Sequence, residues 1–135
     1  MLLVSRAQRE KAGEPAFVDR VVEHFRRYHL EAIYLLPDDV LRRRVEHGIA
    51  KGRGYGLTWE YSLTVFVAHM IRINPRFDEH PAVQRELRDT SREPDLRIDA
   101  LAENLSPGEW EEAASRGDPE AYWREIGAGA PPGGG

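Results

Sequence analysis

Hydrophobic side chains recur at helical spacing along most of this chain. Phe17, Val21 and Phe25 lie four residues apart, which places them on one face of an α-helix. Pro15 stands just before them, where the first turn of a helix tolerates proline. The pattern predicts a helix over residues 15–29.

A second amphipathic segment follows over residues 38–52. Asp38 or Asp39 suits the N-terminal cap of this helix. Glycine inside a helix costs about 1 kcal/mol, so Gly48 on the apolar face suggests that another backbone approaches closely there. The apolar face consists of Leu41, Val45, Gly48 and Ile49.

The segment 58–73 is apolar on nearly every side. Thr58 is expected to cap its N-terminus, and the proline at 75 ends it. A helix that is apolar all round usually lies at the centre of a bundle. The side chains expected to be fully buried are Phe66, Val67 and Met70.

Proline marks the start of each later helix. Short helices are expected after Pro81, from Pro94 and after Asp118, and Ser106 with Glu109 has the form of a capping box before another. No strand pattern of any length occurs. The sequence therefore predicts an all-α fold, a compact single-domain bundle of about six or seven helices over residues 1–126. The Gly, Ala and Pro residues of 127–135 predict a disordered tail.

Composition and charge exclude several classes of function. The chain has 135 residues and no cysteine, which removes disulfides, thiolate catalysis and cysteine-based zinc sites. Its net charge of -4 argues against general nucleic-acid binding. The longest apolar region, 63–73, is interrupted by polar residues and too short to span a bilayer, and the N-terminus lacks an export signal. These features predict a cytoplasmic, soluble protein with no membrane partner.

Charge is unevenly divided along the sequence. Residues 1–53 carry 11 Lys and Arg against 8 Asp and Glu, whereas residues 54–135 carry 8 against 15. An asymmetry of this kind can steer a charged partner.

Motifs for catalysis, metals and cofactors are weak. The glycine-rich turn 52–56 lacks the spacing of a phosphate loop and is interpreted as the turn that closes one helix and leads to the next. No pair of histidines has the spacing of metal ligands, so no metal or cofactor is expected. Asp78, Glu79 and His80 together form the one alternative, a loop site for a small enzyme or a ligand-binding protein.

Several segments resemble a family of small, uncharacterised, all-helical bacterial proteins that are often encoded beside type VI secretion spike and effector genes. The resemblance covers about residues 14–123 and carries over no catalytic residue. It implies a role as an accessory protein of a secreted effector, as an adaptor, a chaperone-like protein or an immunity protein. The segments that carry it are Phe17–Arg20 with His29, Val45–Ala50, Tyr55–Thr58, Phe66–Val67 with Met70, Phe77–Pro81, and Arg97–Leu101 with Trp110.

The sequence thus predicts a non-enzymatic module that binds another protein, a secreted effector or a secretion spike component, and it leaves the oligomeric state open. The expected partner-binding residues are Tyr55, Arg76, Phe77 and Asp78, because loops can spare such side chains for a partner. The alternative is that Tyr55 and Phe77 fold back over the core. The two loops are expected to lie roughly 24 Å apart, one helix length. Replacement of Arg76 or Asp78 by alanine is expected to leave stability unchanged.

Overall fold

The computed structural model describes residues 14–127, and this part of the chain is helical with no strand, which confirms the predicted fold class. The tail expected from residue 127 begins at the last residue of the final helix, and residues 128–135 lie outside the described part. The elements are α2 (Glu14–Tyr28), α3 (Leu30–Ile33), α4 (Asp38–Gly54), α5 (Glu60–Arg72), η1 (Phe77–Glu79), α6 (Pro81–Leu87), α7 (Pro94–Asn104), α8 (Pro107–Ala114) and α9 (Pro119–Gly127). The sequence pattern missed the single-turn helix α3 and the 3₁₀ turn η1.

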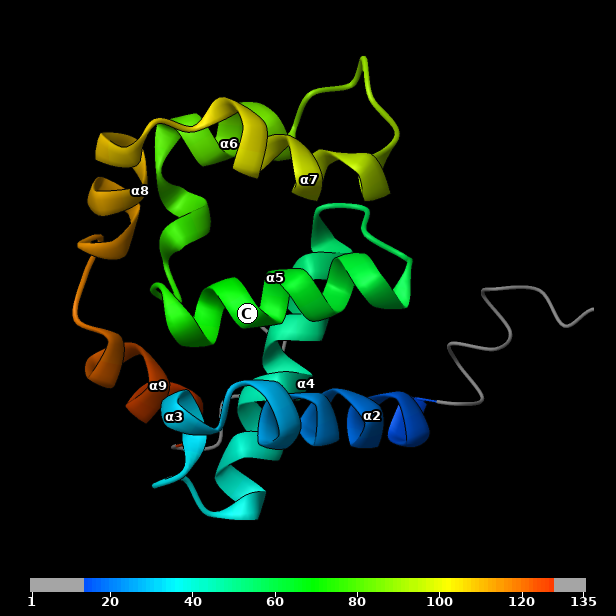
Figure 1. The fold of residues 1–135 in the computed structure, drawn as a ribbon, viewed down its shortest axis with the longest axis vertical. Coiled ribbons are helices and arrows are strands. Elements are labelled where there is room, and N and C mark those ends of the chain that lie inside the picture. Colours follow the sequence, from blue (N-terminus) through cyan, green and yellow to red (C-terminus); the bar gives the residue numbers. More distant parts are fainter. Residues whose placement is uncertain (1–13, 128–135) are drawn as a thin grey trace, which may run out of the picture.

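The helices are arranged around α5, which crosses the middle of the molecule (Figure 1). α4 packs against α5 and also against α2, so that these three helices form one end of the fold. α6 and α7 pack together at the other end, and α7 contacts α5. α8 and α9 run back along one side, and α9 finishes against α4. Within residues 14–127, no helix is both long and apolar enough to cross a membrane.

The centre of the core is α5, as the sequence predicts. Phe66, Val67 and Met70 are all 0% exposed. The same cluster of buried side chains extends from Phe17 on α2 to Trp123 on α9. Burial of this apolar surface is the main force that holds the helices together.

Gly48 allows α4 to approach α5 closely, although not in the way the sequence suggested. A β-carbon at Gly48 would lie 2.9 Å from Cγ2 of Val67, and one at Gly52 would lie 3.0 Å from Leu63. The close neighbours are therefore side chains of α5 rather than its backbone. A third glycine, Gly56, has φ +93° and supplies the left-handed turn expected between the two helices.

The N-terminus of α5 is capped by a residue from another helix, and the expected cap by Thr58 was wrong. The cap position belongs to Trp59, whose side chain makes no capping hydrogen bond. Oδ1 of Asp95 on α7 accepts hydrogen bonds from the backbone N–H groups of Thr58 and Trp59, both at 2.8 Å, and Oδ2 accepts from the Thr58 hydroxyl at 2.8 Å. The negative charge of the carboxylate is also stabilised by the positive end of the helix dipole. Asp95 thus fastens α7 to α5.

Other local signals had mixed outcomes. Ser106 and Glu109 form the predicted capping box of α8. Pro37, rather than Asp38 or Asp39, is the cap residue of α4, and both aspartates lie in its first turn.

Candidate functional site

The two loops expected to bind a partner lie in contact rather than a helix length apart. The hydroxyl of Tyr55 donates a hydrogen bond to Oδ2 of Asp78 at 2.6 Å. The expected separation was wrong because the chain after α5 turns back at Asn74 and Pro75, and η1 then lies close to the end of α4. Asn74 holds this reversal by donating to the backbone oxygens of Ala114 and Gly117 at 3.0 and 3.1 Å.

The exposed Phe77 that the sequence predicted is instead part of the core. Its side chain is 0% exposed, and its ring centroid lies 5.2 Å from that of Phe66 and 5.3 Å from that of His69. Tyr55 is half-buried, with its ring 5.7 Å from that of Phe66. The alternative in which Tyr55 and Phe77 fold back over the core therefore describes the structure. An aromatic side chain beside a buried helix gains more by burial than by exposure.

Arg76 and Asp78 also differ in how far their side chains are exposed. Asp78 is 2% exposed and lies inside the fold. Arg76 is partly exposed, forms an ion pair with Glu79 at 3.0 Å and places its guanidinium 5.1 Å from the ring centroid of Tyr122. Of the four expected partner-binding residues, Arg76 and Tyr55 alone keep part of their surface open to a partner.

Asp78 belongs to a buried polar network that is centred on Lys51. The ammonium of Lys51 lies 2.9 Å from Oδ1 of Asp78, an ion pair without the alignment of a hydrogen bond. The same ammonium donates to the backbone oxygen of Pro75 at 3.1 Å and to the hydroxyl of Tyr122 at 3.4 Å. Lys51 therefore ties α4 to the loop after α5 and to α9.

Gln84 on α6 completes the opposite side of this network. Its amide donates to the Tyr55 hydroxyl at 2.7 Å and to the backbone oxygen of Asp78 at 2.6 Å. The Tyr55 hydroxyl thus accepts one hydrogen bond while it donates another to Asp78. Burial, followed by the hydrogen bond to Asp78, raises the pKa of Tyr55, so this phenol stays protonated at neutral pH.

His47 lies at the other end of the network, beneath α9. α9 covers the face of α4 that carries His47 and Arg44. Nε2 of His47 lies 2.6 Å from the Tyr122 hydroxyl, and the guanidinium of Arg44 lies 5.0 Å from the ring centroid of Trp123. Burial and the nearby charge of Lys51 lower the pKa of His47. The network therefore contains a neutral imidazole, protonated phenols and one ion pair at neutral pH, an arrangement suited to fastening helices.

The alternative site at Asp78, Glu79 and His80 does not converge on a common point. Asp78 turns towards Lys51, and Glu79 is exposed and pairs with Arg76. His80 is 7% exposed, accepts the backbone N–H of Ala82 on Nδ1 and contacts Glu112 through Nε2 at 2.8 Å. Three neighbours in sequence thus serve three separate contacts. Nowhere in residues 14–127 are three His, Asp or Glu side chains grouped as metal ligands would be.

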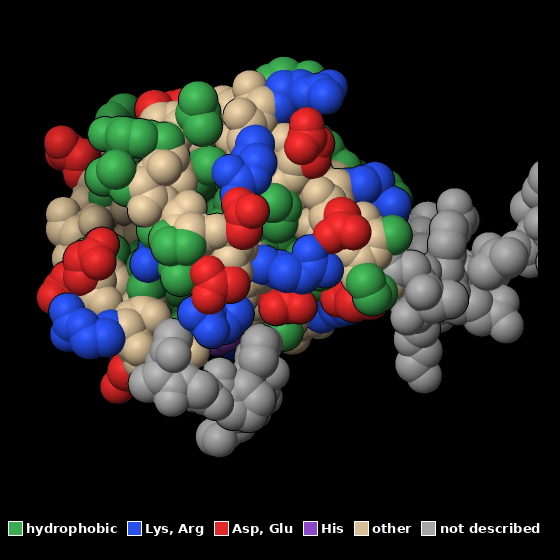
Figure 2. Space-filling view, turned by 90° about the horizontal axis from the view of Figure 1, so that it is seen from below, with side chains coloured by type: hydrophobic (Ala, Val, Ile, Leu, Met, Phe, Trp, Pro, Cys, Tyr) green, Lys and Arg blue, Asp and Glu red, His purple; other side chains and the backbone are tan. Residues whose placement is uncertain are grey.

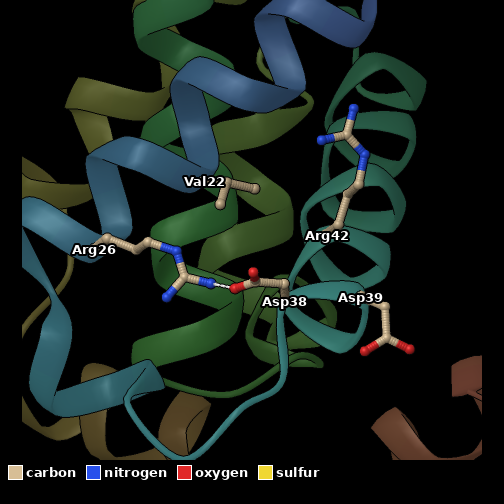
Figure 3. A pocket seen from close by; sticks show the side chains of 5 residues that line it. All are labelled: Val22, Arg26, Asp38, Asp39 and Arg42. Carbon is tan, nitrogen blue, oxygen red and sulfur yellow. Dashed lines mark hydrogen bonds and ion pairs between the residues drawn. The ribbon is translucent and has the colours of Figure 1, made fainter.

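A surface pocket of about 370 Å³ lies between α2 and α4 (Figure 3). Arg26 and Asp38 point towards each other across it and form an ion pair, while Val22 lines its apolar side. Arg42, on the rim, pairs with Asp19 and Glu46. Because these charges neutralise one another, the pocket holds no free cation or anion for a ligand.

The segment that contains α7, α8 and α9 carries an excess of carboxylates, and most of them are exposed; these exposed carboxylates form what we call the outer side of α7–α9. Residues 94–127 contain nine Asp and Glu against three Arg. Glu103, Glu111 and Glu125 are exposed and form no ion pair with any residue in the described range. Glu111 and Glu112 line a surface hollow of about 770 Å³ on α8.

Comparison of the chain with protein-family models, curated proteins and solved structures found no match.

Sequence reasoning missed Lys51, Gln84, Tyr122 and Asp95. One weak signal was available for Lys51, because it is one of only two lysines in the chain. Apart from the contact of Gln84 with Asp78, the contacts described above for these residues join positions 24 to 75 apart in sequence, so helical periodicity carries no information about them.

Proposed function

We propose that this protein is a non-enzymatic interaction module that binds the basic surface of another protein through the acidic outer side of α7–α9. The observation that carries the proposal is the set of exposed carboxylates that pair with no cation of residues 14–127, namely Glu103, Glu111 and Glu125. A carboxylate that stabilises no contact of its own fold remains available to an approaching cation.

The contrast with the other end of the molecule supports this proposal. Residues 14–54 carry seven Asp and Glu and eight Lys and Arg, and most of their side chains form ion pairs with one another. The acidic helices therefore dominate the electric field of the surface. Such a field speeds the encounter with an oppositely charged protein and selects against acidic partners, including nucleic acids.

The partner class follows from the family resemblance. We propose a secreted effector or a spike component of a type VI secretion system as the partner, bound in the cytoplasm before export. The protein then acts as an adaptor, a chaperone-like accessory or an immunity protein. An enzymatic role for Asp78, Glu79 and His80 finds no support in the geometry, because their side chains turn to different partners.

A charge-reversal experiment tests the proposal. The tagged protein is used to capture proteins from cells of its native host, and the captured proteins are quantified by mass spectrometry. The test variant combines Glu103→Lys, Glu111→Lys and Glu125→Lys. The control combines Asp19→Lys, Glu23→Lys and Glu46→Lys, which changes the net charge equally on α2 and α4.

The wild type and the control should capture the same partner, and the test variant should capture about tenfold less, equivalent to about 1.4 kcal/mol. Capture by the wild type should also fall as salt is raised. Equal capture by the test variant contradicts the acidic docking surface. Failure to enrich any effector or spike component contradicts the proposed accessory role.

A further inference from the structure

Large apolar side chains are exposed together at the corner where α2 meets α3. Six large hydrophobic side chains are exposed within residues 14–127, and four of them fall in the eight residues 28–35. Figure 2 shows hydrophobic side chains gathered on this face, towards the α3 end of the molecule. The α2–α3 corner consists of Tyr28 (63% exposed), Leu30 (53%), Tyr34 (66%) and Leu35 (79%).

The backbone holds this corner in a defined shape. Tyr34 N–H donates to the backbone oxygen of Leu30 at 2.9 Å, and Leu36 N–H donates to that of Ile33 at 2.9 Å. The side chain of Ile33 is 1% exposed and anchors the turn in the core. The exposed side chains are therefore held on an ordered surface. This order lowers the entropy cost of binding a partner there.

The area of the corner fits one half of a small homodimer interface. A whole aromatic side chain brings about 150–250 Å², so four large side chains exposed by half or more present on the order of 500 Å². Homodimer interfaces are about 65% apolar. An apolar centre of this size therefore belongs to an interface of about 800 Å² per copy, the usual value for a stable complex.

The charges around the corner favour a second copy over a strongly charged partner. Arg27 pairs with Glu23 at 3.4 Å, and Glu31 pairs with Arg72 at 2.9 Å. Arg26 pairs with Asp38. The rim thus carries three cations and three anions in balance, and a two-fold axis sets such a surface against itself so that both signs can be matched.

The position of the corner also suits self-association. α7 and α8, which carry Glu103 and Glu111, lie towards the opposite end of the molecule (Figure 1). Two copies that meet through the corner therefore keep these acidic helices apart. From these observations we propose that the protein forms a two-fold symmetric homodimer through the α2–α3 corner.

The first test measures self-association by sedimentation over protein concentrations from the low micromolar to the hundreds of micromolar. The wild type should pass from monomer to dimer. Leu35→Glu, which would bury a charge in the interface, should raise the dimer dissociation constant about tenfold or more. Leu96→Glu is the matched control, because Leu96 is an exposed leucine (47%) on α7, and it should dimerise like the wild type.

A second test does not depend on how the charged variant folds. The chain has no cysteine, so Leu35→Cys introduces a single thiol that a short bis-maleimide can join only to the same thiol of another copy. Cross-linked dimer should form much faster for Leu35→Cys than for Leu96→Cys.

Wild-type protein that stays monomeric at every concentration overturns the proposal. So does equal cross-linking of the two cysteine variants, or a dimer that Leu35→Glu leaves intact. Loss of a captured host protein in Leu35→Glu, with a monomeric wild type, would assign the corner to a different partner and likewise overturn it. The result is independent of the proposed docking surface, since the lysine variants of α7–α9 leave the corner unchanged.

Discussion

The carboxylates of this protein fall into two groups with opposite roles. Asp95 on α7, Glu86 on α6 and Asp78 on η1 are buried, and the carboxylate of each contacts several groups. On the outer side of α7–α9, Glu103 and Glu111 are exposed and contact no cation of the described chain. α7 carries members of both groups, Asp95 near its start and Glu103 near its end. The comparison teaches that the enclosed carboxylates hold parts of the fold together, whereas Glu103 and Glu111 stabilise no ion pair within residues 14–127.

Asp95→Ala should produce the largest effect. It removes three hydrogen bonds from the N-terminus of α5, and bonds to a charged acceptor contribute more than neutral ones. The free energy of unfolding, measured by urea titration, should fall by about 3 kcal/mol. Asp99→Ala, whose carboxylate accepts a hydrogen bond from the exposed Tyr61 at 3.0 Å, is the control on the same helix. A loss below 1 kcal/mol for Asp95→Ala would remove it from the structural group.

Asp78→Asn should come next, at about 2 kcal/mol, because it leaves the partly buried Lys51 without its counter-charge. The neutral effect expected of a surface loop is therefore replaced by a loss of stability. Lys51→Met combined with Asp78→Asn should recover part of that loss. Additive effects of the two substitutions in denaturant titrations would show that the ion pair contributes nothing.

Acid should destabilise the protein through His69, a partly buried histidine of α5. Burial lowers the pKa of His69 to about 4, from 6.5 for the exposed group, so the unfolded chain binds a proton that the folded one does not. The stability that depends on neutral His69 is therefore fully present above pH 6.5, and it is lost as the pH falls from 6.5 towards 4. Between pH 7.5 and pH 5 the loss from this residue should be about 2 kcal/mol.

Comparison of the wild type with His69→Phe tests this pH dependence. Phenylalanine fits between the rings of Phe77 and Trp110, which lie 5.3 and 5.5 Å from that of His69. The variant should lose less stability over this pH range. The buried carboxylates act at lower pH: hydrogen bonds from Trp59 and Thr58 outweigh the effect of burial and lower the pKa of Asp95. An identical pH profile in His69→Phe would assign the acid sensitivity to other groups.

Neutralising the exposed carboxylates should have the smallest effect on stability. Glu103→Gln, Glu111→Gln and Glu125→Gln together should change the free energy of unfolding by less than about 0.5 kcal/mol. Thermal melts of the wild type and the triple variant, at low and at high salt, measure this change in stability. A larger loss would mean that these side chains also serve the fold, and the contrast between the two groups would disappear.

The sequence predicts the helices well because each depends on neighbours in the chain. Apolar periodicity located α2, α4 and α5, and proline with the Ser106 capping box located the starts of later helices. The prediction from sequence failed where a residue makes its contacts with a helix that is distant in the chain. Thr58 seemed the cap of α5 because Asp95, 37 positions later, is invisible to a local pattern.

The candidate site was less predictable than the fold. Phe77 looked like a loop residue because prolines flank its segment, yet the path of the chain after α5 returns it to Phe66. The α2–α3 corner was missed because Tyr28 fits the apolar spacing of α2, and periodicity does not tell which turn of a helix is left uncovered. Exposure of that kind depends on where the other helices end.

The cap that Asp95 provides to α5 has a consequence for synthesis of the protein. The ribosome releases α5 before the chain that contains Asp95, which follows Trp59 by 36 residues and Thr58 by 37. Until α7 emerges and docks, the N–H groups of Thr58 and Trp59 lack the carboxylate that accepts them in the folded protein. The junction that leads into the central helix is therefore fastened late, and a nascent chain stopped before residue 95 should leave that junction open to proteases.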